Sequence, residues 1–291
     1  MAALVASSLF SVGIVLQASE TRGVDSRFSL HLSLIRHLIA RRRWLLGTAV
    51  TLLGYPFHIA GLLLAPLTVV QPALAAGLLL LLVVGARTHE ETIGPRDVVG
   101  VVAIVVGVVA MTLTAPGRSE VHASTGPLLV ALAALVLITL MPYALLRLRG
   151  VGPGSLATLA TFAAGAAYAF DGISTKLVSD HLSDDELVAA IGWLAATVVV
   201  GGLGFLGQVT ALQRRTAAQV GPVIYVAPVL VPVLLSPFLT GEDWGATPLG
   251  GGVLVASLLI VSVGAGLVSA SSSVGRATER EGTSSSHPAR T

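Results

Sequence analysis

The sequence predicts an all-α integral membrane protein, a polytopic bundle of about nine transmembrane helices built from inverted repeats. Of its 291 residues, 54% are hydrophobic and only 11% are charged, and the mean hydropathy is +0.87. A soluble domain has about a quarter charged residues. Apolar runs of about 20 residues recur along the chain, and each can cross a hydrocarbon core of about 30 Å. Two hairpins, 58–97 and 208–244, also share one plan.

Nine apolar segments are predicted as spans: 2–19, 44–64, 66–86, 98–114, 127–146, 155–178, 187–212, 217–240 and 248–269. With the N-terminus outside and the C-terminus in the cytoplasm, every basic residue except Arg118 and Lys176 falls in an inside segment. The acidic loop at 179–186 then lies outside. Because basic residues accumulate on the cytoplasmic side, this bias favours both the number of spans and the orientation.

Residues 28–40 are apolar but short for a span, so we predict an amphipathic helix lying in the inner interface. The helical period places its apolar face at Phe28, Leu32, Ile35 and Ile39. The opposite face then carries Ser29, Ser33, Arg36 and His37. If this segment crossed the membrane there would be ten spans, and Arg41, Arg42 and Arg43 would be stranded outside.

The two hairpins indicate a duplicated chain. Gln71-Pro72 stands in the first where Gly221-Pro222 stands in the second. The hairpins lie five spans apart, and this odd offset inverts the second copy. We predict a first repeat at 1–114, a connecting span at 115–150, a second repeat at 151–269 and a disordered cytoplasmic tail at 270–291. Inverted repeats are typical of secondary transporters that bind substrate near the membrane midplane. The alternative is that any two apolar hairpins look alike.

Short motifs in both hairpins carry a family resemblance. The second hairpin contains QVTAL at 208–212, VGPVIY at 220–225 and a closing Asp243-Trp244. Together with Ala65-Pro66 and Pro72 in the first hairpin, and Ser174 and Lys176 in the sixth span, these resemble the NIPA-type magnesium transporters. That branch belongs to the drug/metabolite transporter superfamily, which has an EmrE-like fold. The resemblance covers most of the chain and implies transport of Mg²⁺ or another divalent cation.

The second span departs from that family. The family has an acidic residue directly after a glycine and an amide three residues later, whereas this chain has Tyr55 and His58 at those places. The resemblance therefore leaves two substrate classes open. One is a divalent cation, and the other is a small organic metabolite or drug-like solute.

Asp171 is the main candidate for substrate or ion binding, and the tentative metal ligand. Ionisable groups inside a bilayer are costly and mark functional sites, and Asp171 is the carboxylate that falls clearly within a predicted span. His58 and Gln71 flank the first outer turn by six residues each, which places them at a similar depth. We expect these three side chains to line an outward-facing cavity. The alternatives are a structural cap or ion pair for Asp171, and hydrogen bonds within the bundle for the other two.

Two neighbours of Asp171 complete the predicted outer site. Tyr168 and Thr175 lie on the same helix, and Thr175 shares a face with Asp171 at the i+4 spacing. Lys176 points about 140° away from Asp171 at 100° per residue, and on its own it would extend to the outer surface. Its match to the family is what suggests a role in binding.

On the inner side, Gln208, Gln219 and Tyr225 occupy comparable places in the second repeat. Prolines are predicted as hinges because each removes a backbone donor and frees an upstream carbonyl for substrate; they are Pro72, Pro222, Pro228 and Pro232. The alternative is that these prolines only shape the packing of the helices.

The leading functional hypothesis is a secondary transporter that works by alternating access, and a non-transporting membrane scaffold is the alternative from another class. No cysteine is present, which excludes a thiol nucleophile or thiolate metal site. Gly202-x-Gly204-x-x-Gly207 fits a dinucleotide fingerprint, but inside a membrane helix it predicts close packing. We expect no enzyme activity, no cofactor and no nucleic-acid partner.

The expected surroundings are the lipid bilayer of a plasma membrane. Lys176 is the only lysine and asparagine is absent. Both residue types have A-rich codons, which indicates a GC-rich bacterial genome and hence the cell membrane. Either a monomer or a homodimer is compatible with the sequence.

Overall fold

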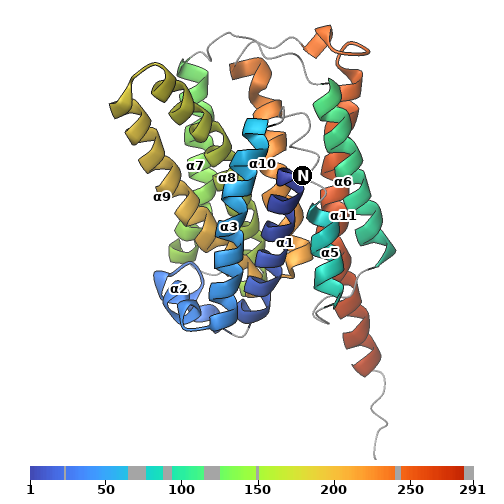
Figure 1. The fold of residues 1–291 in the computed structure, drawn as a ribbon. Helices are drawn as coiled ribbons and strands as arrows, with labels where there is room; N and C mark the ends of the chain where they lie inside the picture. Colours follow the sequence, from blue (N-terminus) through green and yellow to red (C-terminus); the bar gives the residue numbers. More distant parts are fainter. Residues whose placement is uncertain are drawn as a thin grey trace, which may run out of the picture.

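The computed structural model describes residues 1–22, 24–64, 77–87, 94–114, 125–148, 151–239 and 244–284. Within these ranges the chain is helical, with no strand, and the long helices stand side by side as a bundle (Figure 1). The predicted spans correspond to α1 (Ala2–Thr21), α3 (Arg42–Leu64), α5 (Gly77–Arg87), α6 (Pro95–Thr114), α7 (Thr125–Leu148), α8 (Pro153–Ser183), α9 (Leu187–Leu212), α10 (Ala217–Leu239) and α11 (Gly252–Ser284). The prediction of a polytopic helical membrane protein is confirmed.

Several helices have the length and composition of membrane spans. Within the described residues, five segments qualify: Ala2–Thr21, Pro95–Thr114, Gly126–Arg147, Pro153–Ser174 and Leu187–Leu212. The outward faces of these helices are apolar, and Val130, Leu137 and Val188 are each more than 65% exposed. Large aliphatic side chains in such numbers on an outer face fit a surface that is covered by lipid tails.

The helices pair in the same way within each half of the chain. α1 packs against α3 and α5, while α8 packs against α9 and α10. α5 contacts α6 in the first half, and α10 contacts α11 in the second. Two further pairs, α5 with α10 and α6 with α11, join the halves. These contacts in one half thus have counterparts in the other, as the inverted repeat would require. The repeat itself stays a prediction.

Glycines allow the closest helix crossings. A Cβ on Gly100 of α6 would lie 2.7 Å from the carbonyl oxygen of Gly264 of α11, and one on Gly264 would lie 2.5 Å from the carbonyl oxygen of Gly100. Gly13 of α1 and Gly47 of α3 make the same reciprocal approach at 2.8 Å. Small residues at such crossings bring backbones together, which is how membrane helices gain packing energy.

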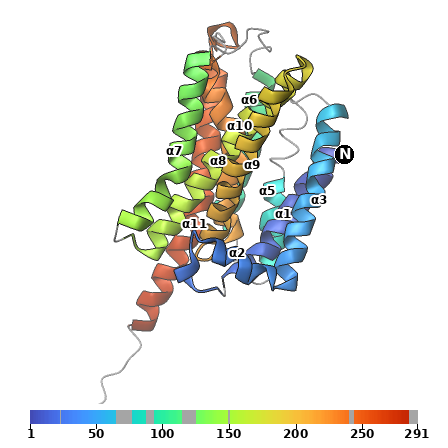
Figure 2. The same ribbon diagram turned by 90° about the vertical axis from the view of Figure 1, so that its left-hand side faces the viewer.

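The segment between α1 and α3 holds a short helix, α2 (Leu32–Ile39), preceded by a single 3-10 turn, η1 (Ser26–Phe28). At 1.5 Å per residue α2 is about 12 Å long, too short to cross a core of about 30 Å. It lies across the lower end of α3 and α9 (Figure 2). This excludes the ten-span reading of residues 28–40.

The predicted apolar face of that segment divides between the protein and the outer surface. Phe28 and Ile35 pack against a buried cluster that contains Leu34 and Leu38 of α2. Leu32 is 75% and Ile39 50% exposed, on the side of α2 that is left for the membrane interface. That this side lies against lipid stays a prediction.

α11 extends beyond the predicted ninth span. The prediction places a disordered tail at 270–291, but the helix continues to Ser284, and residues 285–291 lie outside the described part. Arginine, alanine and glutamate are strong helix formers, and they recur from Arg276 to Glu281. This composition explains why the helix continues past its apolar part.

Candidate functional site

Asp171 lies on α8 at the point where α8 crosses α9. Its carboxylate rests on Gly201, where a Cβ would lie 2.8 Å from Oδ2 and 3.2 Å from Oδ1. The side chain is half-buried, and its Oδ1 atom is buried without a hydrogen-bond partner among the described residues. A carboxylate oxygen in this condition lacks the contacts that usually compensate its desolvation. It is a candidate ligand for a cation.

Three tyrosines lie close to one another, and two of them lie near Asp171. Tyr55 of α3 and Tyr168 of α8 both lie within electrostatic range of the carboxylate. Tyr225 of α10 neighbours both of these tyrosines. The group therefore draws side chains from α3, α8 and α10, and α9 contributes the glycine beneath the carboxylate. We call Asp171 and the three tyrosines the central group.

His58 lies at the edge of this group. Its ring packs edge-to-face on Phe10 of α1, with centroids 6.2 Å apart. Tyr55 also packs edge-to-face against the Phe10 ring, with ring centroids 5.3 Å apart. The α3 side chain that the structure brings next to Asp171 is thus Tyr55, one of the two positions where the chain departs from the family pattern.

A chain of hydrogen bonds crosses the bundle next to the central group. The Tyr168 hydroxyl donates to Oε1 of Gln208 at 2.7 Å, and Nε2 of Gln208 donates to Oε1 of Gln17 at 3.2 Å. Nε2 of Gln17 in turn donates to Oγ1 of Thr48 at 3.2 Å. These four side chains, which we call the polar chain, join α8, α9, α1 and α3. Gln17 and Thr48 were not among the predicted site residues.

Tyr225 presents an unused hydroxyl. It lies beside Ser11 of α1, but it makes no hydrogen bond of good geometry within the described residues. The Ser11 hydroxyl donates instead to the carbonyl oxygen of Gly77 at 2.7 Å. The Tyr225 hydroxyl is therefore a free polar atom inside the bundle, available to a bound solute or water.

Two prolines one helical turn apart leave the Pro228 carbonyl, which lies near Asp171, without its usual N–H partner four residues on. Three of the four predicted hinge prolines fall inside the continuous helix α10, namely Pro222, Pro228 and Pro232. Pro232 has no N–H for the carbonyl of Pro228, four residues earlier. The Pro228 oxygen faces α8, where it would lie 3.8 Å from a Cβ on Gly172. A carbonyl oxygen without its helical partner thus sits against the residue that follows Asp171.

Other polar residues have structural roles. Ser174, which carried part of the family resemblance, is buried and accepts a hydrogen bond from Thr197 of α9 at 2.8 Å. Gln219 and Thr216 form a capping box at the start of α10, with bonds of 3.1 and 3.2 Å between each backbone N–H and the other side chain. Gln219 therefore stabilises the helix start, and its place in an inner site stays a prediction.

The glycine pattern on α9 packs helices together. Gly204 faces the Ala167 side chain of α8, and a Cβ on Gly207 would lie 3.2 Å from the Ala160 carbonyl oxygen. The packing interpretation is confirmed for these two glycines. No atom of the described residues lies within 4 Å of a Cβ on Gly202, so the first glycine of the pattern takes no part in the crossing that the structure describes.

Several predicted residues cannot be placed. Gln71 and Pro72 lie outside the described residues, and so do the side chains of Thr175, Lys176 and Pro232. Within the described part of the chain, no group of three or more histidine and acidic side chains could hold a metal ion. The central group thus offers one carboxylate, three phenols and backbone oxygen, and no set of several carboxylates.

The fold and the site together define a polytopic helical membrane protein with a carboxylate held inside its bundle. The chain is similar to a protein of Arabidopsis thaliana described as "Probable magnesium transporter NIPA9", with 24% identity over 291 aligned residues. That alignment covers 92% of this chain and 81% of the plant protein. No family model and no solved structure matches the chain.

Proposed function

We propose that this chain is a secondary transporter that moves Mg²⁺ or another divalent cation across a plasma membrane. The observation that carries the proposal is the similarity to a probable magnesium transporter along 92% of the chain. The orientation that we propose has the N-terminus outside and the C-terminus in the cytoplasm, because the arginines then fall inside.

Asp171 is the proposed cation ligand. Mg²⁺ gives up its water reluctantly and is often held through one or two carboxylates with several waters retained. A single carboxylate with an unpartnered oxygen, beside the free Pro228 carbonyl, suits an ion that keeps much of its hydration shell. The phenol groups of Tyr55, Tyr168 and Tyr225 supply further oxygens that can bond to those waters.

Alternating access of two inverted repeats is the proposed mechanism. The central group takes its side chains from both halves of the chain, with Tyr55 from the first and the other three from the second. Relative movement of the halves would therefore change which side of the membrane reaches Asp171. The matching helix pairs of the two halves support this mechanism, which is common among transporters with inverted repeats.

A second candidate substrate is an organic cation or another small organic solute. It is favoured by the three clustered tyrosines, two of them near the carboxylate, because aromatic faces attract organic cations. The replacement of the family's acidic residue by Tyr55 points in the same direction. This candidate keeps the transporter function and changes only what is carried.

Asp171→Asn is the test of this proposal. The purified protein is reconstituted into liposomes that contain a fluorescent Mg²⁺ indicator, and Mg²⁺ uptake is compared between wild type and variant. We expect wild type to carry Mg²⁺ and Asp171→Asn to fall to the rate of empty liposomes. Asp184→Asn, at an exposed position in the α8–α9 turn, is the matched control and should keep the wild-type rate.

A competing arm of the same assay decides between the substrates. Tetraethylammonium uptake is measured with and without Mg²⁺. Uptake of tetraethylammonium but not of Mg²⁺, lost in Asp171→Asn, would select the organic cation. Undiminished uptake by Asp171→Asn in both arms would remove Asp171 from the site, and no uptake of either probe by wild type would contradict the transporter proposal for these substrates.

A further inference from the structure

A segment of the first half packs against the inner end of α9 in the second half. Residues 24–39, which we call the inner strap, connect α1 to α3 and contain η1 and α2. We propose that the inner strap is a latch: it holds the inner side closed and has to lift from α9 when the inner side opens. This proposal rests on the transporter function proposed above and adds the element that controls it.

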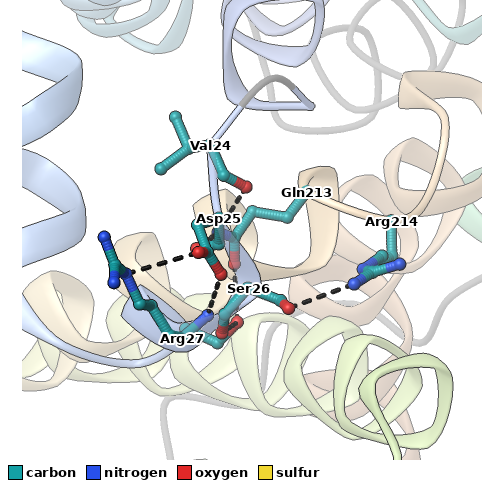
Figure 3. Close-up of polar contacts among 7 residues, drawn as sticks. Val24, Asp25, Ser26, Arg27, Gln213 and Arg214 are labelled. Carbon is teal, nitrogen blue, oxygen red and sulfur yellow. Dashed lines mark hydrogen bonds and ion pairs between the residues drawn. The ribbon is translucent and has the colours of Figure 1, made fainter.

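The polar contacts of the strap converge on Gln213, at the end of α9. Nε2 of Gln213 donates to the carbonyl oxygens of Val24 and Asp25, at 3.4 and 3.2 Å. Oε1 of the same side chain accepts from the Ser29 hydroxyl at 2.8 Å. The oxygen and the nitrogen of this buried amide thus both form hydrogen bonds with the strap. Figure 3 shows Gln213 reaching the Val24–Asp25 backbone.

Two further bonds extend this attachment to the last turn of α9 and to the α9–α10 turn. Nη2 of Arg214 donates to the Ser26 hydroxyl at 3.1 Å (Figure 3). The backbone N–H of Leu30 donates to Oγ1 of Thr210 at 3.0 Å. Leu30 has a positive φ, which is rare for a residue with a bulky side chain. The strap therefore adopts an unfavourable backbone conformation where it meets α9.

Apolar packing completes the attachment. Leu34 and Leu38 of α2 are fully buried and form one cluster with Leu206 and Val209 of α9. Trp44, at the start of α3, belongs to the same cluster. The inner end of α9 is buried throughout from 206 to 213, and so are the first residues of α10 from 217 to 222. The strap covers part of this buried end.

The latch follows from where these residues lie in the chain. The strap belongs to the first half, and Thr210, Gln213 and Arg214 belong to the second. An opening on the inner side moves the halves apart, so it has to break these contacts. A contact within one half, such as that between His181 and Glu186 at 2.6 Å in the α8–α9 hairpin, would persist through the same movement.

Cross-linking tests the latch, because the natural chain has no cysteine. Ser29→Cys and Gln213→Cys are combined in one variant, and the pair is joined by a short bifunctional thiol reagent that reducing agents cleave. We expect cross-linking to lower Mg²⁺ uptake in liposomes about tenfold, equivalent to about 1.4 kcal/mol, and reduction to restore it. The control pair His181→Cys and Glu186→Cys should keep its uptake when joined.

A second measurement needs no substrate. Val209→Cys, beneath α2, reports lifting of the strap through its labelling by a maleimide. Gln213→Ala removes three of the strap's bonds, and we expect it to speed this labelling about tenfold, equivalent to about 1.4 kcal/mol. Asp184→Ala, at the exposed outer turn, should leave the labelling rate unchanged.

The outcomes separate the latch from the transporter function. If the cross-linked Ser29→Cys/Gln213→Cys variant carries Mg²⁺ as fast as it does after the cross-link has been cleaved, the latch is overturned and the transporter function stands. If wild type carries no Mg²⁺, the proposed function fails and the labelling alone decides whether the strap lifts. Labelling of Val209→Cys that Gln213→Ala does not change would contradict a latch in either case.

Discussion

Nε2 of Gln208 donates to Oε1 of Gln17 at 3.2 Å, although 191 residues separate them in the chain. Gln17 lies on α1 and Gln208 on α9, so the bond joins the two halves. Both side chains are buried, at 0% and 4% exposure. Because each amide also bonds to a hydroxyl, of Thr48 and Tyr168 respectively, the bond holds the polar chain in register beside Asp171.

A double-mutant cycle on Gln17 and Gln208 measures this coupling. Each single change to leucine leaves the other amide without its partner, which costs about 1–3 kcal/mol for a buried polar group. The double variant removes both amides, so its loss should be smaller than the sum of the singles. We expect a coupling energy of about 0.6 kcal/mol, typical of hydrogen bonds between membrane helices. Unfolding in mixed micelles measures it, and strictly additive losses would mean that the bond contributes nothing.

Three glycines of α9 should respond differently to alanine, because each faces different surroundings. In Gly201→Ala the new methyl group lies 2.8 Å from Oδ2 of Asp171. That carboxylate can rotate away, so we expect normal folding and a loss of Mg²⁺ uptake. In Gly204→Ala the methyl group meets the Ala167 side chain, which cannot rotate away. We expect that variant to lose about 1–3 kcal/mol of stability from overpacking.

Gly202→Ala is the control for both glycine variants. Its added methyl group meets no described residue within 4 Å, so stability and uptake should match wild type or improve slightly through helix propensity. Thermal unfolding and liposome uptake of the three variants are measured together. Equal uptake by Gly201→Ala and Gly202→Ala would show that the position of the Asp171 carboxylate is not important.

The sequence predicts the helices well and their contacts poorly. Helix positions follow from apolar length, which is a local property, and Asp171 stands out because a carboxylate in an apolar run is costly. Gln17 and Thr48 carry no charge, and nothing local indicates that α1 packs against α9. The polar chain therefore depends on tertiary packing that periodicity cannot supply.

Two other roles differ in how far the sequence indicates them. The helical period of α2 does not show that Leu34 and Leu38 pack on α9, because that contact joins distant parts of the chain. Gln219 is predicted on the inner side because its place in the second repeat is comparable to that of the outer polar residues in the first. Its pairing with Thr216, three residues earlier, is a capping signal, and that spacing could have identified the role.

Pro232→Ala tests the free carbonyl on α10. Alanine restores an N–H at position 232, and this N–H can bond to the Pro228 carbonyl, as in a regular helix. A carbonyl that is bonded within the helix is a weaker ligand. We expect the KM for Mg²⁺ to rise about threefold to tenfold, the equivalent of one hydrogen bond of about 0.5–1.5 kcal/mol. The measurement is the Mg²⁺ dependence of uptake.

Pro142→Ala is the matched control for this change. Pro142 also lies inside a helix, α7, and the carbonyl that it frees belongs to Ile138, a residue 42% exposed on the outer face. We expect no change in KM. An equal rise in both variants would mean that proline acts through helix shape, and the Pro228 carbonyl would then have no role as a ligand.

Gly264→Ala should separate the two halves where α6 crosses α11. The added methyl group would lie 2.5 Å from the Gly100 carbonyl oxygen and 3.0 Å from the Ile104 backbone nitrogen. Both are backbone atoms, so relief requires the helices to move apart, and we expect a loss of about 1–3 kcal/mol in stability. Gly266→Ala, two residues further on α11, meets nothing within 4 Å in the described part of the chain and should unfold at the wild-type temperature. If both variants unfold together with wild type, the Gly100–Gly264 crossing is looser than the structure describes.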